Sequence, residues 1–335
     1  MKKFTYSLLF CAVIGSALLL GCSKAKDGGA ASGSGTGTST TAAAAVNAPL
    51  DMKIKWTVGK KYAQRMEMAQ KMDMNMPNMP QPMKQEMNLT EDYSFSALKE
   101  RDGGGTEVEL EFVGFKIDSK MDERALMSFD TSQDVSQDGS NPMASTIRKM
   151  IGAHLKLLSD ADGKVDKVEG YSEFMGRVAG GGKPQDRAMM QSFFNEDTLK
   201  QMCAWAKAMP GHPVKIGDTW PVKLDVSMGP MGTMIMDLKY TFKNWEQHDD
   251  RKCARLEYKG TMTSKPSGVP TPMAMKIEKG QLSGTTWYDP ELAMVVDTVS
   301  DQDMTMKITM QGKPMNSKIA QKITVKLTEV TDLAK

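Results

Sequence analysis

Apolar and polar residues alternate along much of this chain, and the alternation predicts strands. In residues 107–112 three glutamates alternate with valine, leucine and phenylalanine, and residues 304–310 and 319–327 follow the same pattern. Successive side chains of a strand point to opposite faces, so a period of two residues is typical of a strand with one buried face. We therefore predict long strands, each with one apolar and one polar face.

Turn signals between these segments predict antiparallel pairing. Asp102-Gly103 and Asp162-Gly163 are dipeptides that favour tight turns. The second lies between residues 155–158 and residues 164–168, and this arrangement is typical of a hairpin. Asp160-Ala-Asp162-Gly163 also has a faint likeness to a calcium loop, but the ligands expected further along are missing, so a turn is the better interpretation.

Two distant parts of the chain repeat the same order of residues. Residues 59–68 and 217–226 each begin with glycine, carry an aromatic residue three positions later, and then alternate between apolar and polar. Further on, Tyr93-Ser-Phe95 matches Tyr240-Thr-Phe242. The repeat predicts two similar β-rich halves.

Between the halves the period changes to that of helices. After Asn141-Pro142, a typical helix start, apolar residues recur every three or four positions as far as Gly152. Residues 171–178 and the segment 195–209, which begins with Asn195 as a cap, have a similar spacing. We predict three short helices that cover the apolar face of the sheet.

Together these patterns predict a mainly β (α+β) fold. We expect a curved antiparallel sheet or half-barrel, made from two similar β-rich halves with a helical insertion between them. The predicted boundaries are 51–139 for the first half, 140–214 for the insertion with its hairpin, and 215–335 for the second half, all within a single β-rich domain over residues 51–335.

The first residues are typical of an exported protein. Lys2 and Lys3 precede an apolar stretch, residues 8–20, which is too short to span a bilayer as a helix. The stretch ends in Leu19-Leu20-Gly21-Cys22, which resembles the lipobox of bacterial lipoproteins. The resemblance implies a lipoprotein signal peptide over residues 1–21 and a mature protein held on a membrane by acyl chains, such as palmitate, on Cys22.

Residues 22–50 form the predicted tether between this anchor and the folded domain. They consist mainly of Gly, Ala, Ser and Thr and have too few large apolar side chains to fold, so we expect a flexible segment. An aspartate directly after the acylated cysteine resembles an inner-membrane retention signal. Ser23 stands there instead, so we expect the outer membrane, facing the periplasm, rather than the inner membrane.

Charge and histidine content narrow the function. The 335 residues include 43 basic and 41 acidic side chains, a formal net charge of +2, which offers no basic surface for nucleic acid. His154, His212 and His248 lie far apart along the chain, and no nucleophile elbow, zinc helix or phosphate-binding loop is found. We expect a non-catalytic protein without a cofactor.

Methionine is unusually frequent, with 31 residues. The candidate site residues cluster near the start of the first half: Met66, Met68, Met72, Met74, Met76 and Met79. Three interpretations stay open. These side chains fill the core; or they form an adaptable apolar face that binds an apolar ligand or an envelope protein, because methionine is flexible and polarisable; or their thioethers bind Cu(I) or Ag(I), since soft ligands select soft metals.

Two cysteines, Cys203 and Cys253, are left in the folded part. In an exported protein such a pair forms either a disulfide or two separate buried thiols, and the spacing does not decide between them.

Several short motifs together resemble a known family. They are Gly59-Lys-Lys-Tyr62, Glu100-Arg-Asp-Gly-Gly, Ser128-Phe129-Asp130, Asp160-Ala-Asp-Gly-Lys and Ile216-Gly-Asp-Thr-Trp220. In this order they resemble an uncharacterised family of bacterial envelope lipoproteins, over most of residues 54–330. Because that family has no established activity, the resemblance implies location and domain extent but no site residue. We expect a lipid-anchored envelope protein that binds or scaffolds through an apolar Met-rich face, with a Cu(I)- or Ag(I)-binding protein as the alternative.

Overall fold

The computed structural model describes residues 48–75, 81–138, 144–180, 191, 195–202, 205–266, 273–310 and 313–333. The predicted signal peptide, Cys22 and nearly all of the predicted tether lie outside these residues. Within the described part, no helix is long and apolar enough to cross a membrane.

Strands make up most of the described chain and form one antiparallel sheet. The strands are β1 (Lys60–Asn75), β2 (Met83–Glu100), β3 (Thr106–Met121), β4 (Arg124–Asp130), β5 (His154–Ser159), β6 (Val165–Glu169), β7 (Thr219–Ser227), β8 (Thr233–His248), β9 (Arg251–Lys265), β10 (Met273–Asp289), β11 (Met294–Met310) and β12 (Lys313–Asp332). Their order is β6-β5-β3-β2-β1-β12-β11-β10-β9-β8-β7, and β4 pairs with β3 beside this path. The predicted mainly β fold is confirmed, and the sheet is open, with β6 and β7 at its two edges.

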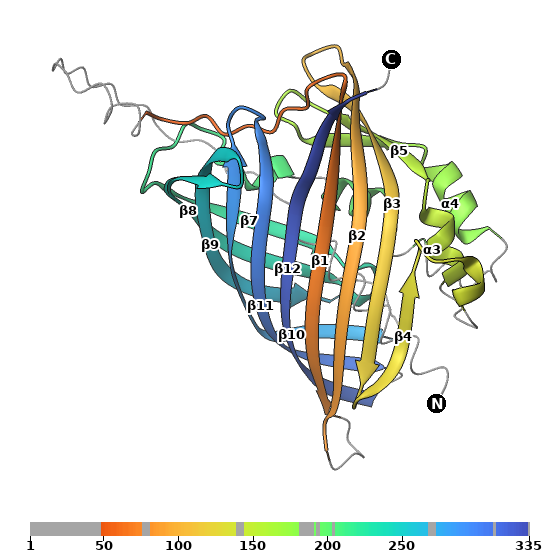
Figure 1. Ribbon diagram of the computed structural model, residues 1–335. Helices are drawn as coiled ribbons and strands as arrows, with labels where there is room; N and C mark the ends of the chain where they lie inside the picture. Colours follow the sequence, from red (N-terminus) through yellow and green to blue (C-terminus); the bar gives the residue numbers. More distant parts are fainter. Residues whose placement is uncertain are drawn as a thin grey trace, which may run out of the picture.

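The sheet is strongly curved. Figure 1 shows β1, β2, β3 and β12 side by side at the front, while β8, β9 and β10 bend round behind them. Buried side chains of β1 and of β8 belong to the same hydrophobic cluster, so the buried face is the concave one. We call this the inner face and the opposite, solvent-exposed one the outer face. The predicted curved sheet is therefore confirmed.

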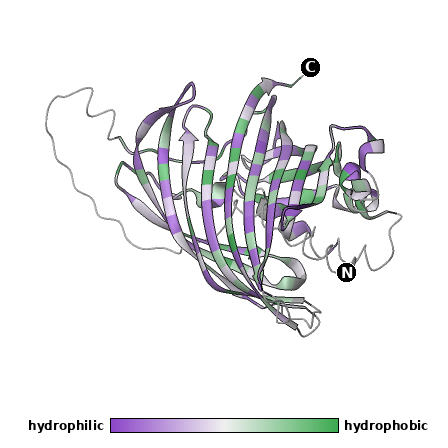
Figure 2. Ribbon diagram, turned by 60° about the horizontal axis from the view of Figure 1, so that its bottom comes forward, coloured by the Kyte–Doolittle hydropathy of each residue, from purple (hydrophilic) through white to green (hydrophobic). Residues whose placement is uncertain are grey.

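Side chains along each long strand alternate between these two faces. On β1, Met66, Met68, Met72 and Met74 are buried on the inner face, and the residues between them are exposed, apart from Gln70, which shares the inner face. In Figure 2 hydrophobic and hydrophilic residues accordingly follow one another along the strands. The alternation predicted for residues 107–112 is present from Val108 to Phe112, where all three apolar side chains are at most 5 % exposed, whereas Glu107 is also buried, with 8 % exposure.

Two hydrophobic clusters occupy the inner face. The small core cluster consists of Met66, Met68, Met87, Leu89, Ile117, Phe129, Ala144, Ile147, Ile323 and Val325. The large core cluster extends over both halves of the chain and includes Met72 and Met74 on β1 as well as the stacked rings of Trp220, Tyr240 and Tyr258 on β7, β8 and β9.

The two halves begin in the same way. Gly59 and Gly217 both have a positive φ, of 83° and 94°, a conformation that glycine adopts without strain. Their N–H groups donate to the carbonyl groups of Ala97 (2.8 Å) and Phe242 (2.7 Å) on the neighbouring strands. The predicted match of Phe95 with Phe242 is wrong by two residues, since the strand register makes Phe95 and Tyr240 equivalent.

In its described residues, the insertion contains three short α-helices and one 3-10 helix. These are α3 (Ala144–Met150), α4 (Tyr171–Ala179), α6 (Glu196–Met202) and η2 (Trp205–Ala208); η1 (Val135–Asp138) and η3 (Gly229–Met231) lie outside the insertion. Asn195 caps α6 as predicted, because its side-chain oxygen accepts the N–H of Thr198 at 2.9 Å. The third predicted helix is too long, since the segment 195–209 divides into α6 and η2. The predicted helix start at Asn141-Pro142 lies outside the described residues.

The helices cover the apolar face of the sheet. Phe174 of α4 stacks on Phe112 of β3 with ring centres 5.5 Å apart, and Ala144 and Ile147 of α3 belong to the small core cluster. α6 contacts both β6 and β7, the two edge strands. The insertion therefore connects the two edges of the open sheet.

Candidate functional site

The predicted methionine site is divided by the fold. Met66, Met68, Met72 and Met74 are all buried on the inner face, with exposures of 0 to 5 %. Met66 and Met68 belong to the small core cluster, whereas Met72 and Met74 belong to the large one. Met76 and Met79 lie outside the described residues. The structure therefore does not bring the described candidates together as one exposed face.

Other strands add methionines to the same inner face, and the sequence pattern on β1 alone did not reveal this. Met83 on β2 lies directly opposite Met74. Further buried methionines come from β8 to β12: Met234, Met236, Met262, Met275, Met306 and Met315. The part of the inner face around Met72 and Met74 is thus lined by flexible thioether side chains from many strands.

Buried polar side chains interrupt this apolar surface. Gln70 on β1, Gln321 on β12 and Gln302 on β11 lie opposite one another in one row across three neighbouring strands. Gln85 on β2 and Ser317 on β12 lie nearby on the same face. We call these five residues the polar belt; each is at most 7 % exposed. On β1 the belt lies between Met68 of the small core cluster and Met72 of the large one.

The polar belt is only partly satisfied by hydrogen bonds. Gln321 Nε2 donates to Gln302 Oε1 at 2.7 Å, and Gln85 Nε2 donates to Ser119 Oγ at 3.2 Å. Among the described residues, Gln70 Nε2, Gln85 Oε1 and Ser317 Oγ have no partner. A buried polar atom without a hydrogen bond costs roughly 1–3 kcal/mol, so the concentration of three in one belt calls for an explanation.

A carboxyl group also lies on the inner face. Glu91 on β2 is opposite Met66 on β1 and Phe115 on β3, and its carboxylate accepts a hydrogen bond from the Tyr93 hydroxyl. Burial raises the pKa of Glu91 to about 7, although the Tyr93 hydroxyl opposes the shift. Glu91 was not among the residues predicted from the sequence, although it occupies an apolar position in the alternation of β2.

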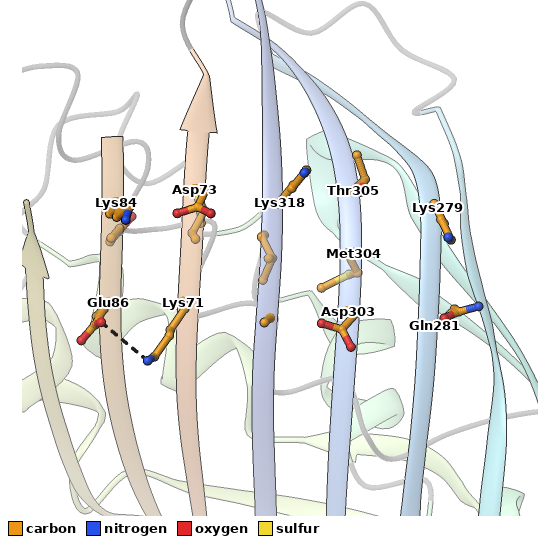
Figure 3. A pocket seen from close by; sticks show the side chains of 14 residues that line it. Lys71, Asp73, Lys84, Glu86, Lys279, Gln281, Asp303, Met304, Thr305 and Lys318 are labelled. Carbon is orange, nitrogen blue, oxygen red and sulfur yellow. Dashed lines mark ion pairs between the residues drawn. The ribbon is translucent and has the colours of Figure 1, made fainter. Parts of the chain in front are cut away.

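The outer face carries a polar hollow of about 670 Å³. Figure 3 shows it over β2, β1, β12, β11 and β10, with charged side chains from each strand. Lys71 pairs with Glu86 at 3.8 Å, and Glu86 also pairs with Lys120 at 3.1 Å. Half of its fourteen lining residues are charged, so the hollow differs from the predominantly apolar clefts that bind apolar ligands.

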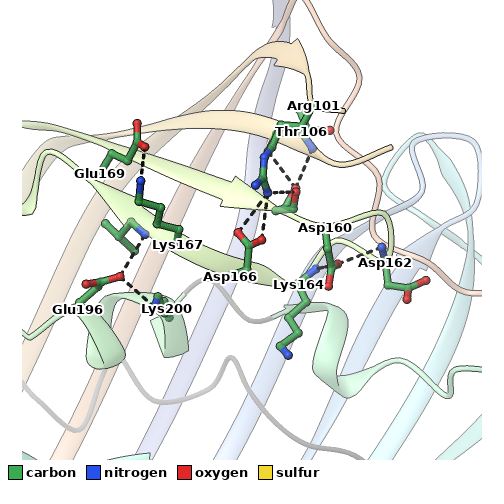
Figure 4. A network of polar contacts seen from close by, with 12 residues as sticks. Arg101, Thr106, Asp160, Asp162, Lys164, Asp166, Lys167, Glu169, Glu196 and Lys200 are labelled. Atoms are coloured by element: carbon green, nitrogen blue, oxygen red, sulfur yellow. Dashed lines mark hydrogen bonds and ion pairs between the residues drawn. The ribbon is translucent and has the colours of Figure 1, made fainter. Parts of the chain in front are cut away.

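The Asp160 turn is structural, as predicted. Asp160 Oδ1 accepts the N–H groups of Asp162 (3.0 Å) and Lys164 (2.9 Å), which fixes the turn between β5 and β6. Nearby, Arg101 donates to the carbonyl of Ser159 at 2.6 Å and pairs with Asp166 at 3.1 Å (Figure 4). No group of three or more His, Cys, Asp or Glu side chains in the described residues is arranged to hold a metal ion.

Two of the three histidines are engaged separately with carboxylates. His248 stacks on Trp287 with ring centres 4.1 Å apart and lies 3.0 Å from Asp297. His154 lies 3.5 Å from Glu109. The two pairs are on different strands, β8 and β11 for the first and β5 and β3 for the second, so they do not form one site.

Of the two cysteines Cys203 and Cys253, the structure describes only Cys253. Cys253 on β9 is fully buried, and burial raises the pKa of its thiol to about 11, which makes it unreactive. Cys203 lies outside the described residues. Both interpretations of the pair, a disulfide and two separate buried thiols, stay predictions.

A family model described as a family of unknown function, DUF6263, matches residues 103–319. The chain belongs to the DUF6263 family. This match agrees with the predicted uncharacterised family. In the structure, the DUF6263 match extends from the loop before β3 into β12, and β1 and β2 lie outside it.

Likenesses to solved structures are distant. The lipovitellin chain in a structure of lipid–protein interactions in lipovitellin has a TM-score of 0.45 and 8 % identity, over 84 % of this chain and 26 % of that one. A putative exported protein with a YmcC-like fold from Bacteroides fragilis has a TM-score of 0.24 and 11 % identity, over 84 % and 100 %. A DUF1329 family protein from Desulfovibrio piger has a TM-score of 0.13 and 9 % identity, over 82 % and 86 %.

The DUF6263 chain thus spans about a quarter of the lipovitellin chain. No curated protein matches it. Likenesses at these TM-scores carry no argument about its function.

Proposed function

We propose that this protein is a non-catalytic binding or scaffolding module of the bacterial cell envelope that holds an apolar or amphipathic ligand against its inner face. One observation supports the proposal above the others: the polar belt places three unpartnered polar atoms within a mainly apolar surface. A core that served stability alone would gain from apolar residues at these positions. Polar groups kept at such a cost are typical of binding sites, where a few polar groups orient a ligand in an apolar pocket.

The lining of the inner face fits an apolar partner of variable shape. Methionine side chains are unbranched and polarisable, so they repack around different apolar surfaces with little cost. Met74 and Met306 lie directly opposite Ser317 of the belt in the strand register, Met72 lies diagonally from it, and Met83 lies beyond Met74 on β2. Since the described side chains pack against one another, ligand entry requires these flexible side chains to move apart.

The envelope location is part of the same proposal and rests on the first residues. The lipobox-like Leu19-Leu20-Gly21-Cys22 supports an acylated Cys22 as the membrane anchor, and Ser23 supports the outer membrane, facing the periplasm. Residues 22–50, with the acylated cysteine at their start, would then be the tether that holds the folded domain away from the bilayer.

Binding to the inner face is tested with a dye that becomes fluorescent in apolar surroundings, N-phenyl-1-naphthylamine. The protein for this test is the full chain with Cys22→Ser, so that no acyl chain competes. We expect saturable fluorescence that decanol displaces. Val222→Asp places a charge on the inner face, and Lys223→Asp places the same charge on the outer face of the same strand. We expect the first to weaken dye binding and the second to leave it unchanged; equal behaviour of the two variants contradicts the proposal.

A soft-metal site is the second candidate, and one contact favours it. Met74 and Met83 lie directly opposite each other on β1 and β2, a position that brings side chains of neighbouring strands to about 5 Å at Cβ. Two thioethers at this separation suit Cu(I) or Ag(I). If they bind Ag(I), Met74→Leu with Met83→Leu abolishes binding in a silver titration. Stability then changes little, because Met and Leu are close in volume.

A further inference from the structure

Two glutamines of the polar belt are diagonal neighbours on the inner face. Gln70 on β1 lies opposite Met87 on β2, and Gln85 lies opposite Met72, two residues along the same strands. Diagonal neighbours on one face of an antiparallel pair are roughly 7–8 Å apart at Cα, within reach of long side chains. Gln70 is 4 % exposed and Gln85 is 1 % exposed, so both amides lie away from bulk water.

The atoms of Gln70 and Gln85 that lack a hydrogen-bond partner are complementary. Gln70 Nε2, a donor, and Gln85 Oε1, an acceptor, both lack a partner among the described residues. The two do not bond to each other. The amide nitrogen of the second glutamine, Gln85 Nε2, already donates to Ser119 Oγ on β3. One unused donor and one unused acceptor therefore lie close together inside an apolar surface.

We propose that Gln70 and Gln85 form a recognition site for a neutral hydroxyl group on an amphipathic ligand. A hydroxyl both donates and accepts, so it donates to Gln85 Oε1 and accepts from Gln70 Nε2. Its apolar chain packs on the methionines and leucines beside the belt. This inference rests on the proposed function and names the chemical class of the ligand.

The headgroup has to be uncharged, because the polar belt consists of amides and one hydroxyl. A buried charge without a partner is strongly unfavourable, and the belt offers no counter-charge. Ordered water is the other occupant that would satisfy the same two atoms.

The test compares two isomers, of which one has a hydroxyl hydrogen and the other has none. N-phenyl-1-naphthylamine bound to the full chain with Cys22→Ser is displaced by decanol or by nonyl methyl ether. Decanol donates and accepts, whereas the ether only accepts. We expect decanol to bind roughly fivefold more tightly than the ether, the effect of one hydrogen bond.

Two variants assign the two hydrogen bonds, and a third serves as the control. Gln85→Leu removes the acceptor, so the preference for decanol over the ether should disappear. Gln70→Leu removes the donor, so both competitors should weaken by roughly fivefold and the preference should remain. Gln281→Leu, an exposed glutamine on the outer face of β10, is the control and should change nothing. Gln85→Met replaces Gln85→Leu if the latter does not fold.

The outcomes separate this inference from the proposed function. If both competitors displace the dye equally and the belt variants have no effect, the belt holds ordered water only and the inference is wrong, while apolar binding still stands. If the dye does not bind to the folded protein, both the proposed function and the inference fail. A free fatty acid that competes better than decanol would also overturn the assignment of a neutral headgroup.

Discussion

Replacing Glu91 by glutamine should make the protein more stable at alkaline pH and leave it nearly unchanged at acidic pH. Glu91 lies on the inner face between Met66 and Phe115, and burial raises its pKa to about 7. Glutamine has the same shape and keeps an oxygen that accepts the Tyr93 hydroxyl. The substitution therefore removes the ionisation and little else.

The sign and size of this change in stability follow from proton binding. Between the unfolded pKa of 4.5 and the folded pKa of about 7, the folded chain keeps the proton and the unfolded chain releases it. The contribution of protonated Glu91 to the free energy of unfolding is therefore fully present below the unfolded pKa and is lost as pH rises through this window. The full difference between the folded and the unfolded pKa corresponds to about 3 kcal/mol of stability. This figure is an upper value, because Glu91 keeps some exposure to solvent.

Urea unfolding at pH 4.5, 6, 7 and 8.5 measures the effect. The quantity of interest is the free energy of unfolding of Glu91→Gln minus that of the unsubstituted protein, in which contributions of other carboxyl groups cancel. We expect this difference to grow from near zero at pH 4.5 to at most about 3 kcal/mol at pH 8.5. Glu67→Gln, on the outer face of β1, is the control. A difference that does not vary with pH refutes the reasoning about Glu91.

Three further predictions concern the anchor, the packing and the domain. Cys22→Ala should abolish membrane attachment, and a variant that still sediments with membranes after salt and carbonate washes contradicts the lipobox assignment. Gly260→Ala should lower the free energy of unfolding by about 1–3 kcal/mol, because an added Cβ would collide with the Asp237 carbonyl; Gly176→Ala, with open space around it, should not destabilise. Residues 51–335 should unfold in one calorimetric transition, and two separate transitions would indicate two domains.

Much of the fold was predictable because it depends on local patterns. The alternation of residues 107–112 sets the buried face of β3, and the Asp162-Gly163 turn sets the β5–β6 hairpin. The cap at Asn195 similarly begins α6. These features depend on neighbours within a few residues, so the chain itself carries the information.

The register of the strands and the length of the third helix were less predictable, because they depend on strands that are distant along the chain. The two halves match in order, yet Phe95 is equivalent to Tyr240 rather than to Phe242. A shift of two residues keeps every side chain on its own face, so the apolar pattern cannot detect it. Segment 195–209 likewise holds α6 and η2, and α6 contacts β6 and β7, which the apolar spacing of the segment does not reveal.

The candidate site was predictable in part, and the polar residues on the inner face explain why. The sequence pointed to Met66, Met68, Met72 and Met74, but the same alternation contains Gln70 at an inward position. Read on one strand, a glutamine in an apolar series is a single exception. It becomes significant once β12 and β11 place Gln321 and Gln302 in the same row, which only the order of strands determines.

The inner face therefore combines two opposing tendencies. Its methionines and aromatic rings favour a dry, packed core, whereas the polar belt and Glu91 are unfavourable in such a core. For stability alone, leucine in place of Gln70 or Gln85 would serve better. A face that keeps both kinds of residue is less stable than it could be, and this is the condition expected of a surface that exchanges its own contacts for those of a ligand.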